Sequence, residues 1–123
     1  MNGNKIVLDT NIILYLLDGN QELAHLLNGM ELFISIISEI ELLGYQNITE
    51  IEKVKVKLFL SECQIIPLHT EIKENCIELK QKYKIKTPDA IVASTSKYLN
   101  LPLLTADKGF ESLSDTNVLL YKL

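Results

Sequence analysis

Short, nearly uninterrupted hydrophobic runs recur along the chain, separated by longer stretches in which hydrophobic residues return every three or four positions. The runs predict five β-strands, over residues 5–8, 32–36, 64–68, 102–105 and 118–121. Four of these runs lack the alternation of polar and hydrophobic residues that a half-exposed strand shows. They therefore indicate strands that are buried on both faces, as in a parallel sheet.

The stretches between the strands have the period of α-helices. We expect helices over residues 21–28, 38–45, 49–62, 70–83 and 88–99. Ser38 and Glu41 have the spacing of a capping box at the start of the second of these helices. Thr87 before Pro88 is a typical helix start, and Asn100 suits a left-handed C-terminal cap. Strands that alternate with helices predict an α/β fold in three layers, with helices on both faces of the sheet.

The length of 123 residues predicts a single domain that spans residues 1–123. No hydrophobic stretch is long enough to cross a membrane, and the first predicted strand begins too early to leave room for a signal peptide. Cys63 and Cys76 form no paired motif and are typical of structural thiols in a reducing compartment. We therefore expect a cytoplasmic protein.

Four acidic residues stand near the points where predicted strands give way to helices. They are Asp9, Glu41, Asp89 and Asp107. Since the carboxyl ends of parallel strands form one edge of the sheet, where α/β proteins bind their ligands, we expect these carboxylates to converge there. The small polar residues Thr10, Asn11 and Thr105 would lie beside them.

Converging carboxylates repel one another strongly where water is partly excluded. A bound divalent cation removes that repulsion, and oxygen ligands without cysteine or histidine favour Mg²⁺ or Mn²⁺ over zinc. One or two such ions promote hydrolysis of a phosphodiester bond. The four acids therefore predict a metal-dependent nuclease.

Each acid taken alone also has a purely structural interpretation. Asp9 suits the N-cap of a helix, and Glu41 could complete the capping box with Ser38. Asp89 would interact favourably with a helix dipole, and Asp107 could begin a turn. Only their common placement at one edge of the sheet favours a shared function.

The net charge of −4 contrasts with the basic surface that is usual in nucleic-acid-binding proteins. Lysines are concentrated in residues 53–57 and 80–86. These clusters could face phosphate groups, although a run of lysines on a helix is usually a solvated surface.

Three ordered segments resemble those of a known family. They are VLDTNIILYLL near the N-terminus, ISIISEIELLGY, and PDAIVASTSKYLNLPLLTADKGFESL near the C-terminus. With these segments the chain resembles the PIN-domain family, and within it the VapC-like toxins of toxin–antitoxin pairs, nearly end to end. The resemblance implies a five-stranded parallel sheet in the order 3-2-1-4-5.

The resemblance also implies an endoribonuclease with four catalytic, metal-binding acids and three supporting polar residues. The acids are Asp9, Glu41, Asp89 and Asp107, which would bind Mg²⁺ or Mn²⁺, and the supporting residues are Thr10, Asn11 and Thr105. The implied partners are an RNA substrate, a cognate antitoxin protein and a second copy of the chain, with no membrane. Candidate surfaces for the antitoxin are Ile13, Leu14, Leu16 and Leu17, and residues 40–45.

Four other functions are alternatives to a toxin nuclease, and the sequence argues against two of them. A haloacid-dehalogenase-like phosphatase needs a second aspartate two residues after Asp9, where this chain has Asn11. A receiver-like phosphoacceptor needs an early acidic pair, which is also missing. A stand-alone RNA-processing PIN nuclease and a non-catalytic PIN-like binding module both fit the same pattern of residues.

Overall fold

The computed structural model describes residues 4–122 and contains a five-stranded, all-parallel sheet. The strands are β1 (Lys5–Leu8), β2 (Glu31–Ser35), β3 (Gln64–Ile66), β4 (Leu103–Thr105) and β5 (Val118–Leu120). Their order is β3-β2-β1-β4-β5, which confirms the predicted topology. Because β1 and β4 are neighbours, the chain segments that follow them lie side by side although they are almost a hundred residues apart.

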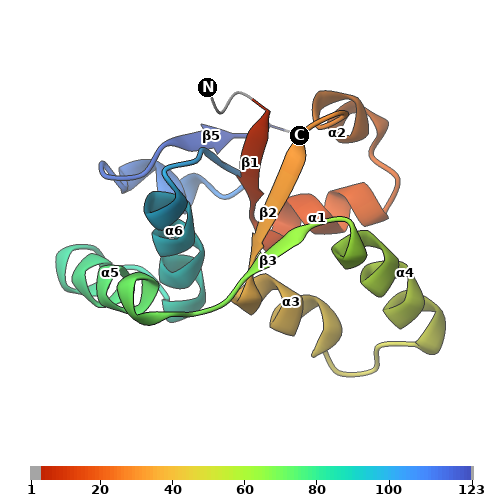
Figure 1. Ribbon diagram of the computed structural model, residues 1–123, viewed down its shortest axis with the longest axis horizontal. Helices are drawn as coiled ribbons and strands as arrows, with labels where there is room; N and C mark the ends of the chain where they lie inside the picture. Colours follow the sequence, from red (N-terminus) through yellow and green to blue (C-terminus); the bar gives the residue numbers. More distant parts are fainter. Residues whose placement is uncertain (1–3, 123) are drawn as a thin grey trace.

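Within residues 4–122, six α-helices and one 3₁₀ helix surround the sheet (Figure 1). They are α1 (Thr10–Leu17), α2 (Gln21–Leu26), α3 (Ile36–Leu43), α4 (Glu50–Ser61), α5 (Thr70–Lys82), α6 (Thr87–Leu99) and the 3₁₀ helix Lys108–Ser112. Helices α1, α2 and α4 cover one face of the sheet, and α5 and α6 cover the other (Figure 1). The predicted three-layer α/β fold is therefore confirmed.

The side chains of β1 show how the sheet joins two hydrophobic cores. Ile6 and Leu8 pack into the core on the side of α1, α2 and α4, whereas Val7 packs into the core on the side of α5 and α6. Successive side chains of a strand point to opposite faces, so all three are buried. This explains why the run of hydrophobic residues has no polar interruption until Asp9.

Helix α3 begins earlier than the sequence predicts, and this changes the place of an acid. Its N-cap is Ser35, whose side chain accepts a hydrogen bond from the backbone N–H of Ile37. Ser38 therefore lies inside the helix, and the predicted capping box of Ser38 with Glu41 is wrong. Glu41 lies in the second turn of α3, one turn further from the strand than expected.

The hydrophobic residues of α4 form two stripes, and only one of them faces the core. Val56 and Leu60 are buried, but Ile51, Val54 and Leu58 are exposed, with 82% of Ile51 accessible to solvent. The stripe of Ile51, Val54 and Leu58 is thus directed away from the sheet. A capping box that was not predicted holds the start of the helix: the backbone N–H of Thr49 donates to Glu52 Oε1, and the backbone N–H of Glu52 donates to Thr49 Oγ1.

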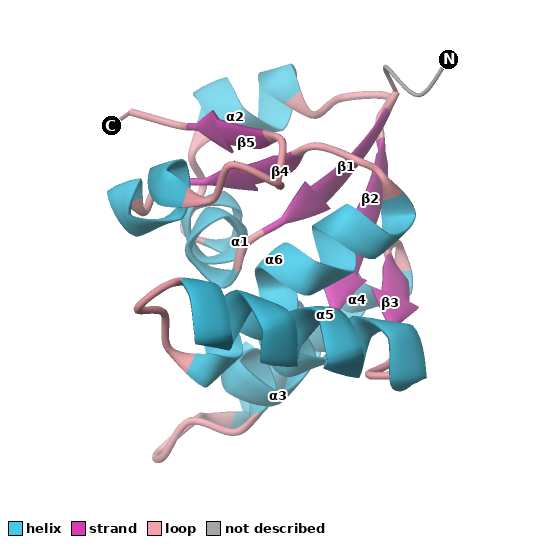
Figure 2. Ribbon diagram, turned by 90° about the vertical axis from the view of Figure 1, so that its left-hand side faces the viewer, coloured by secondary structure: helices cyan, strands magenta, loops and turns pink. Residues whose placement is uncertain are grey.

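Helix α6 occupies the centre of its layer, packed between the sheet and α5 (Figure 2). It begins at Thr87 with Lys86 at the N-cap position, one residue earlier than predicted. Its end is as expected, because Asn100 adopts a left-handed conformation with φ of 55°. Across residues 4–122, every helix is too short or too polar to span a lipid bilayer.

Candidate active site

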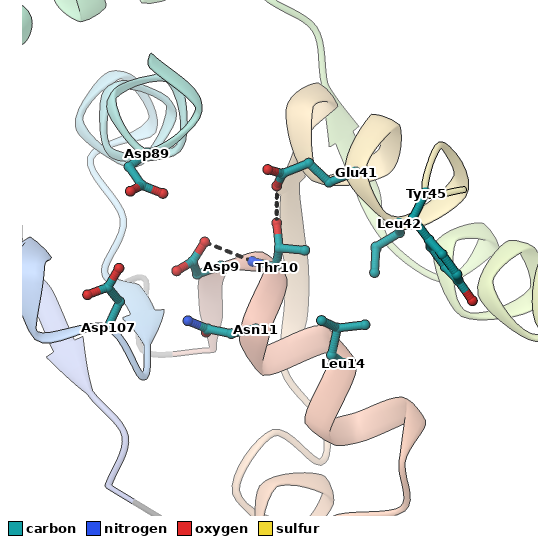
Figure 3. A pocket seen from close by; sticks show the side chains of 9 residues that line it. All are labelled: Asp9, Thr10, Asn11, Leu14, Glu41, Leu42, Tyr45, Asp89 and Asp107. Atoms are coloured by element: carbon teal, nitrogen blue, oxygen red, sulfur yellow. Dashed lines mark hydrogen bonds between the residues drawn. The ribbon is translucent and has the colours of Figure 1, made fainter. Parts of the chain in front are cut away.

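A pocket of about 550 Å³ lies where the chain leaves the carboxyl ends of the central strands (Figure 3). All four acids singled out in the sequence line it, from four separate segments of the chain. The complete lining is Asp9, Thr10, Asn11, Leu14, Glu41, Leu42, Tyr45, Asp89 and Asp107. We call this the acidic pocket.

Asp9 is the most firmly fixed of the four acids. It directly follows β1, caps α1, and exposes only 6% of its surface. One carboxylate oxygen, Oδ1, accepts a hydrogen bond of 2.8 Å from the backbone N–H of Thr10. The other, Oδ2, accepts one of 2.7 Å from the buried hydroxyl of Thr105. The expected N-cap role and the place in the pocket therefore coexist in one side chain.

Thr105 connects the acid after β1 with the acid after β4. Its Oγ1 donates to Asp9 and accepts a hydrogen bond of 3.0 Å from the backbone N–H of Asp107. Asp107 in turn caps the 3₁₀ helix, since its Oδ1 accepts a 2.8 Å hydrogen bond from the backbone N–H of Gly109. Thr105 does not line the pocket itself but supports two residues that do.

Asn11 holds the first turn of α1 against the segment after β4. Its Oδ1 accepts a hydrogen bond of 3.3 Å from the backbone N–H of Ala106. The amide nitrogen then points into the pocket on the side of Asp107 (Figure 3). Asn11 therefore offers a donor for a ligand's oxygen atom, in addition to fixing the wall of the pocket.

Glu41 reaches the pocket from α3 and is positioned through Thr10. The Thr10 hydroxyl lies 2.8 Å from Glu41 Oε1 and 2.8 Å from the hydroxyl of buried Ser38. A hydroxyl has one proton to donate but two lone pairs, so Thr10 can donate to Glu41 while it accepts from Ser38. This chain of three side chains joins α1 to α3.

Asp89 approaches from the opposite wall, in the first turn of α6. Its carboxylate points toward Asp9 and Asp107 across the pocket (Figure 3). Among the described residues, no side chain or backbone group donates a hydrogen bond to it. Asp89 is thus the least constrained member of the set.

Burial and the charges of neighbouring acids raise the pKa of two of the four acids, Asp9 and Asp89. Burial raises the pKa of Asp9, the hydrogen bonds from Thr105 and Thr10 partly oppose this, and the charges of Asp89 and Asp107 raise it further. Burial also raises the pKa of Asp89, with further contributions from the charges of Asp107 and Glu41. Each carboxylate is therefore within electrostatic range of its neighbours, and the pocket favours a positive charge.

The donor set fits a hard divalent cation in its chemistry. Four carboxylates and one amide, with no sulfur or imidazole, are ligands of the kind that Mg²⁺ and Mn²⁺ prefer. In residues 4–122, however, no three acidic, histidine or cysteine side chains are arranged so that they could hold one ion directly. The acids surround a common space, and side-chain movement is needed before several of them can contact one cation.

Four residues were not predicted to form or support the pocket, although Leu14, Leu42 and Tyr45 belong to the surfaces expected to bind an antitoxin. Ser38 supports Thr10 and Glu41, and the hydrophobic residues Leu14, Leu42 and Tyr45 form the outer wall of the pocket. Ser38 lies three residues before Glu41 and so on the same face of α3. This spacing could have indicated from the sequence that Ser38 lies beside the acid. The three hydrophobic residues could not be distinguished from core residues by their pattern.

Comparison with known families gives a match over most of the chain. The sequence model of the PIN domain matches residues 6–116. Comparison with curated proteins gives no match.

Among solved structures, the chain is similar to several toxin–antitoxin proteins. It shares 29% identity with a chain of a toxin–antitoxin complex from Klebsiella pneumoniae, with a TM-score of 0.82 over 96% of this chain and 99% of that one. It shares 26% identity with VapBC-1 from nontypeable Haemophilus influenzae, with a TM-score of 0.75 over 94% and 97% of the two chains. VapBC2 from Rickettsia felis, solved with a DNA fragment from its promoter, has the same fold at 23% identity, with a TM-score of 0.82 over 96% and 99%.

Proposed function

The chain belongs to the PIN domain family and is VapC-like in fold. We propose that it is a Mg²⁺- or Mn²⁺-dependent endoribonuclease and the toxin of a toxin–antitoxin pair. The observation that carries the proposal is the convergence of Asp9, Glu41, Asp89 and Asp107 on one pocket. In this proposal residues 1–123 form one nuclease domain that acts in the cytoplasm on phosphodiester bonds of RNA.

The four acids would hold the metal, and the metal would supply charge stabilisation and a more acidic water for hydrolysis. The protein's own part is to fix the ligands. Thr105 holds Asp9 and the backbone of Asp107, and Thr10 holds Glu41. Asn11 would donate a hydrogen bond to an oxygen atom of the substrate. Asp89, free of such contacts, would move to complete the ligand set.

An antitoxin is the protein partner we propose, because the similar structures from Klebsiella pneumoniae and Haemophilus influenzae are toxin–antitoxin proteins. A second hollow lies between α1, α3 and α4 and shares Leu14, Leu42 and Tyr45 with the acidic pocket. A partner segment could therefore lie in this hollow and enter the acidic pocket. Of the hydrophobic residues expected to form the partner surface, Leu14 and Ile40 are exposed, but Ile13 is fully buried.

A homodimer is the assembly that we propose for the toxin, as the resemblance to the VapC-like proteins implies. Sedimentation equilibrium of the purified chain distinguishes a dimer from a monomer. A mass of about 28 kDa, twice that of the chain of 14.0 kDa, is the expected result.

Cleavage of a mixed RNA pool tests the central proposal. The wild type, Asp9→Asn and Asp107→Asn are incubated with Mg²⁺, Mn²⁺ or EDTA, and the products are resolved by gel electrophoresis. We expect cleavage by the wild type with either metal, none with EDTA, and none by the variants. Both substitutions keep the size of the side chain while they remove a charged ligand.

The outcomes separate the nuclease from the alternatives. Wild-type protein that is folded and supplied with metal but cleaves no RNA, including RNA extracted from cells that express it, would favour the non-catalytic binding module. Cleavage that proceeds equally in EDTA would exclude the metal-dependent mechanism. Cleavage confined to one precursor RNA, with no growth arrest on expression, would favour a processing enzyme over a toxin.

A further inference from the structure

A smaller cavity of about 240 Å³ opens beside the acidic pocket and shares two of its acids, Asp89 and Asp107. Its remaining lining is Lys84, Ile85, Lys86, Gly109 and Phe110. It lies between the segment that connects α5 to α6 and the start of the 3₁₀ helix. We call it the lysine cavity. Asp89 and Asp107 therefore lie where the two cavities adjoin.

The two lysines of this cavity are available to a ligand. Both are exposed, and among residues 4–122 neither forms an ion pair or a side-chain hydrogen bond. Neighbouring lysines are occupied in other ways, since Lys82 pairs with Asp115 and Lys80 donates to the carbonyl oxygen of Ile85. The charge of Lys86 acts on the acidic pocket, because it partly opposes the rise in the pKa of Asp89.

The position of these lysines reduces the electrostatic repulsion between the acidic pocket and its proposed RNA substrate. A nucleic acid strand carries one negative charge for each phosphate, and a chain of net charge −4 with four converging carboxylates repels it. A metal at the acids could neutralise the phosphate that is cleaved, but not the next one along the strand. That neighbouring phosphate needs a cation close to the acids but outside their pocket.

We propose that Lys84 and Lys86 bind the backbone phosphate adjacent to the bond that is cleaved, and so fix the path of single-stranded RNA over the acidic pocket. The inference rests on the proposed function and adds to it a specific substrate contact. The strand leaves the acidic pocket past Asp89 and Asp107 and enters the lysine cavity. Lysine binds phosphate as a point charge without reading base identity, so this contact positions the strand and does not select its sequence.

A second basic hollow is less suited to this role. It is lined by Tyr15, Ala106, Lys108, Leu120, Tyr121 and Lys122. It shares no residue with the acidic pocket, whereas the lysine cavity shares two. Of these two basic hollows, the lysine cavity is therefore the one that offers the strand a continuous route from the acidic pocket.

The test compares two double variants that lose the same charge. Lys84→Gln/Lys86→Gln removes the proposed contact, and Lys57→Gln/Lys73→Gln removes two exposed lysines that line neither cavity. Binding of a labelled single-stranded RNA oligonucleotide is measured in EDTA, which prevents cleavage, at several salt concentrations. Each lost phosphate contact lowers the salt slope of log K by about 0.7 for a single strand.

We expect the lysine-cavity variant to bind RNA about tenfold more weakly, with its salt slope reduced by about 0.7 to 1.4. The control variant keeps the wild-type slope. In cleavage assays with Mn²⁺ the loss in kcat/KM falls mainly on KM, because the contact holds substrate and transition state alike. Lys84→Arg/Lys86→Arg restores binding, and thermal melting shows all variants folded.

Three results would each overturn the inference. If the wild type cleaves RNA and both Gln variants match it in affinity, slope and KM, the lysine contact is wrong and the nuclease stands. If equal losses appear in the two Gln variants, only the overall charge matters and the lysine contact is also wrong. If the wild type neither binds nor cleaves RNA, the proposed function fails and this inference fails with it.

Discussion

Two of the four acids follow β-strands and two lie on helices, and the structure holds the two pairs differently. Asp9 and Asp107 are joined through the buried hydroxyl of Thr105. Glu41 has a single side-chain contact, with Thr10, and Asp89 has none among the described residues. Asp9 and Asp107, the fixed pair, are therefore held in place by hydrogen bonds. Glu41 and Asp89, the adjustable pair, can move toward a ligand. This explains how four acids share a pocket although no three of them are placed to hold one ion.

The largest expected effect comes from the fixed pair. Asp9→Asn removes a charged ligand, and we expect it to lower RNA cleavage by more than the roughly 100-fold that loss of an outer-shell partner costs. Asparagine is as good an N-cap as aspartate, so α1 should keep its start. Cleavage rates and thermal melting of the same preparation measure both effects. Activity above a tenth of the wild type would show that Asp9 is not a ligand.

Thr105→Val tests the contact that makes this pair rigid. Valine fills nearly the same volume but leaves the Asp9 carboxylate without one donor and the Asp107 N–H without its acceptor. We expect a 10- to 100-fold loss of cleavage and a loss of about 1–3 kcal/mol in the free energy of unfolding. Urea denaturation measures the latter. Thr105→Ser keeps the hydroxyl and serves as the matched control, with most activity retained.

Thr10→Val removes the corresponding hydroxyl beside Glu41, one of the two acids that lie on helices. Glu41 loses its one side-chain hydrogen bond, and the buried hydroxyl of Ser38 loses its bond to Thr10. Glu41 lies at the surface, where water can replace the lost donor, and Ser38 is uncharged, whereas Thr105→Val removes a donor from a buried carboxylate. We expect about a tenfold loss of cleavage and a stability change smaller than that of Thr105→Val. An equal or greater effect of Thr10→Val on either measurement would contradict the distinction between the two pairs.

The smallest effect is expected on stability, from Asp89→Asn without metal. Burial and the charges of Asp107 and Glu41 raise the pKa of Asp89, so its ionised form destabilises the folded state. Removing that charge should stabilise the protein at pH 7 in EDTA by less than about 1 kcal/mol, because solvent screens a partly exposed group. That corresponds to a rise in Tm of no more than about 5 °C.

The pH dependence of this difference has a definite sign. A carboxyl group with a raised pKa in the folded state contributes stability at low pH, which is lost as the pH rises through that pKa. The stability of the wild type should therefore approach that of Asp89→Asn as the pH falls through the raised pKa of Asp89, so the difference in Tm should shrink as the solution is acidified. Melting curves at a series of pH values measure it. A difference that widens at low pH would exclude the charge repulsion.

The fold was predictable because its strands are uninterrupted hydrophobic runs with acids at their ends. Residues buried on both faces of β1 leave few alternatives to a central parallel strand. The same reasoning predicted that the acids would converge at one edge of the sheet, and the pairing of β1 with β4 places Asp9 and Asp107 there side by side. The resemblance to the PIN family, rather than periodicity, supplied the strand order.

Two features depended on contacts that the sequence does not display. Ser35 and Ser38 are equally good caps by type, and the choice follows from the bond of Ser38 to Thr10, which is 28 residues away. Helix α4 has two hydrophobic stripes, and the packing of Val56 and Leu60 on the core decides which one is buried. The hydrogen bonds of Thr105 to Asp9 and Asp107 likewise could not be predicted, because they depend on the pairing of β1 with β4.

The hydrogen bond between Thr105 and Asp9 spans 96 residues, and this has a consequence for how the protein is made. The acidic pocket needs residues 9, 41, 89 and 107 together, so a nascent chain that has not reached residue 107 lacks the complete pocket. A sheet whose central pair joins residues 5–8 to residues 103–105 also forms late, because such distant pairing is slow. During translation the pocket therefore cannot form before residue 107 has been added, and a partner protein present at that moment would meet the pocket as soon as it exists.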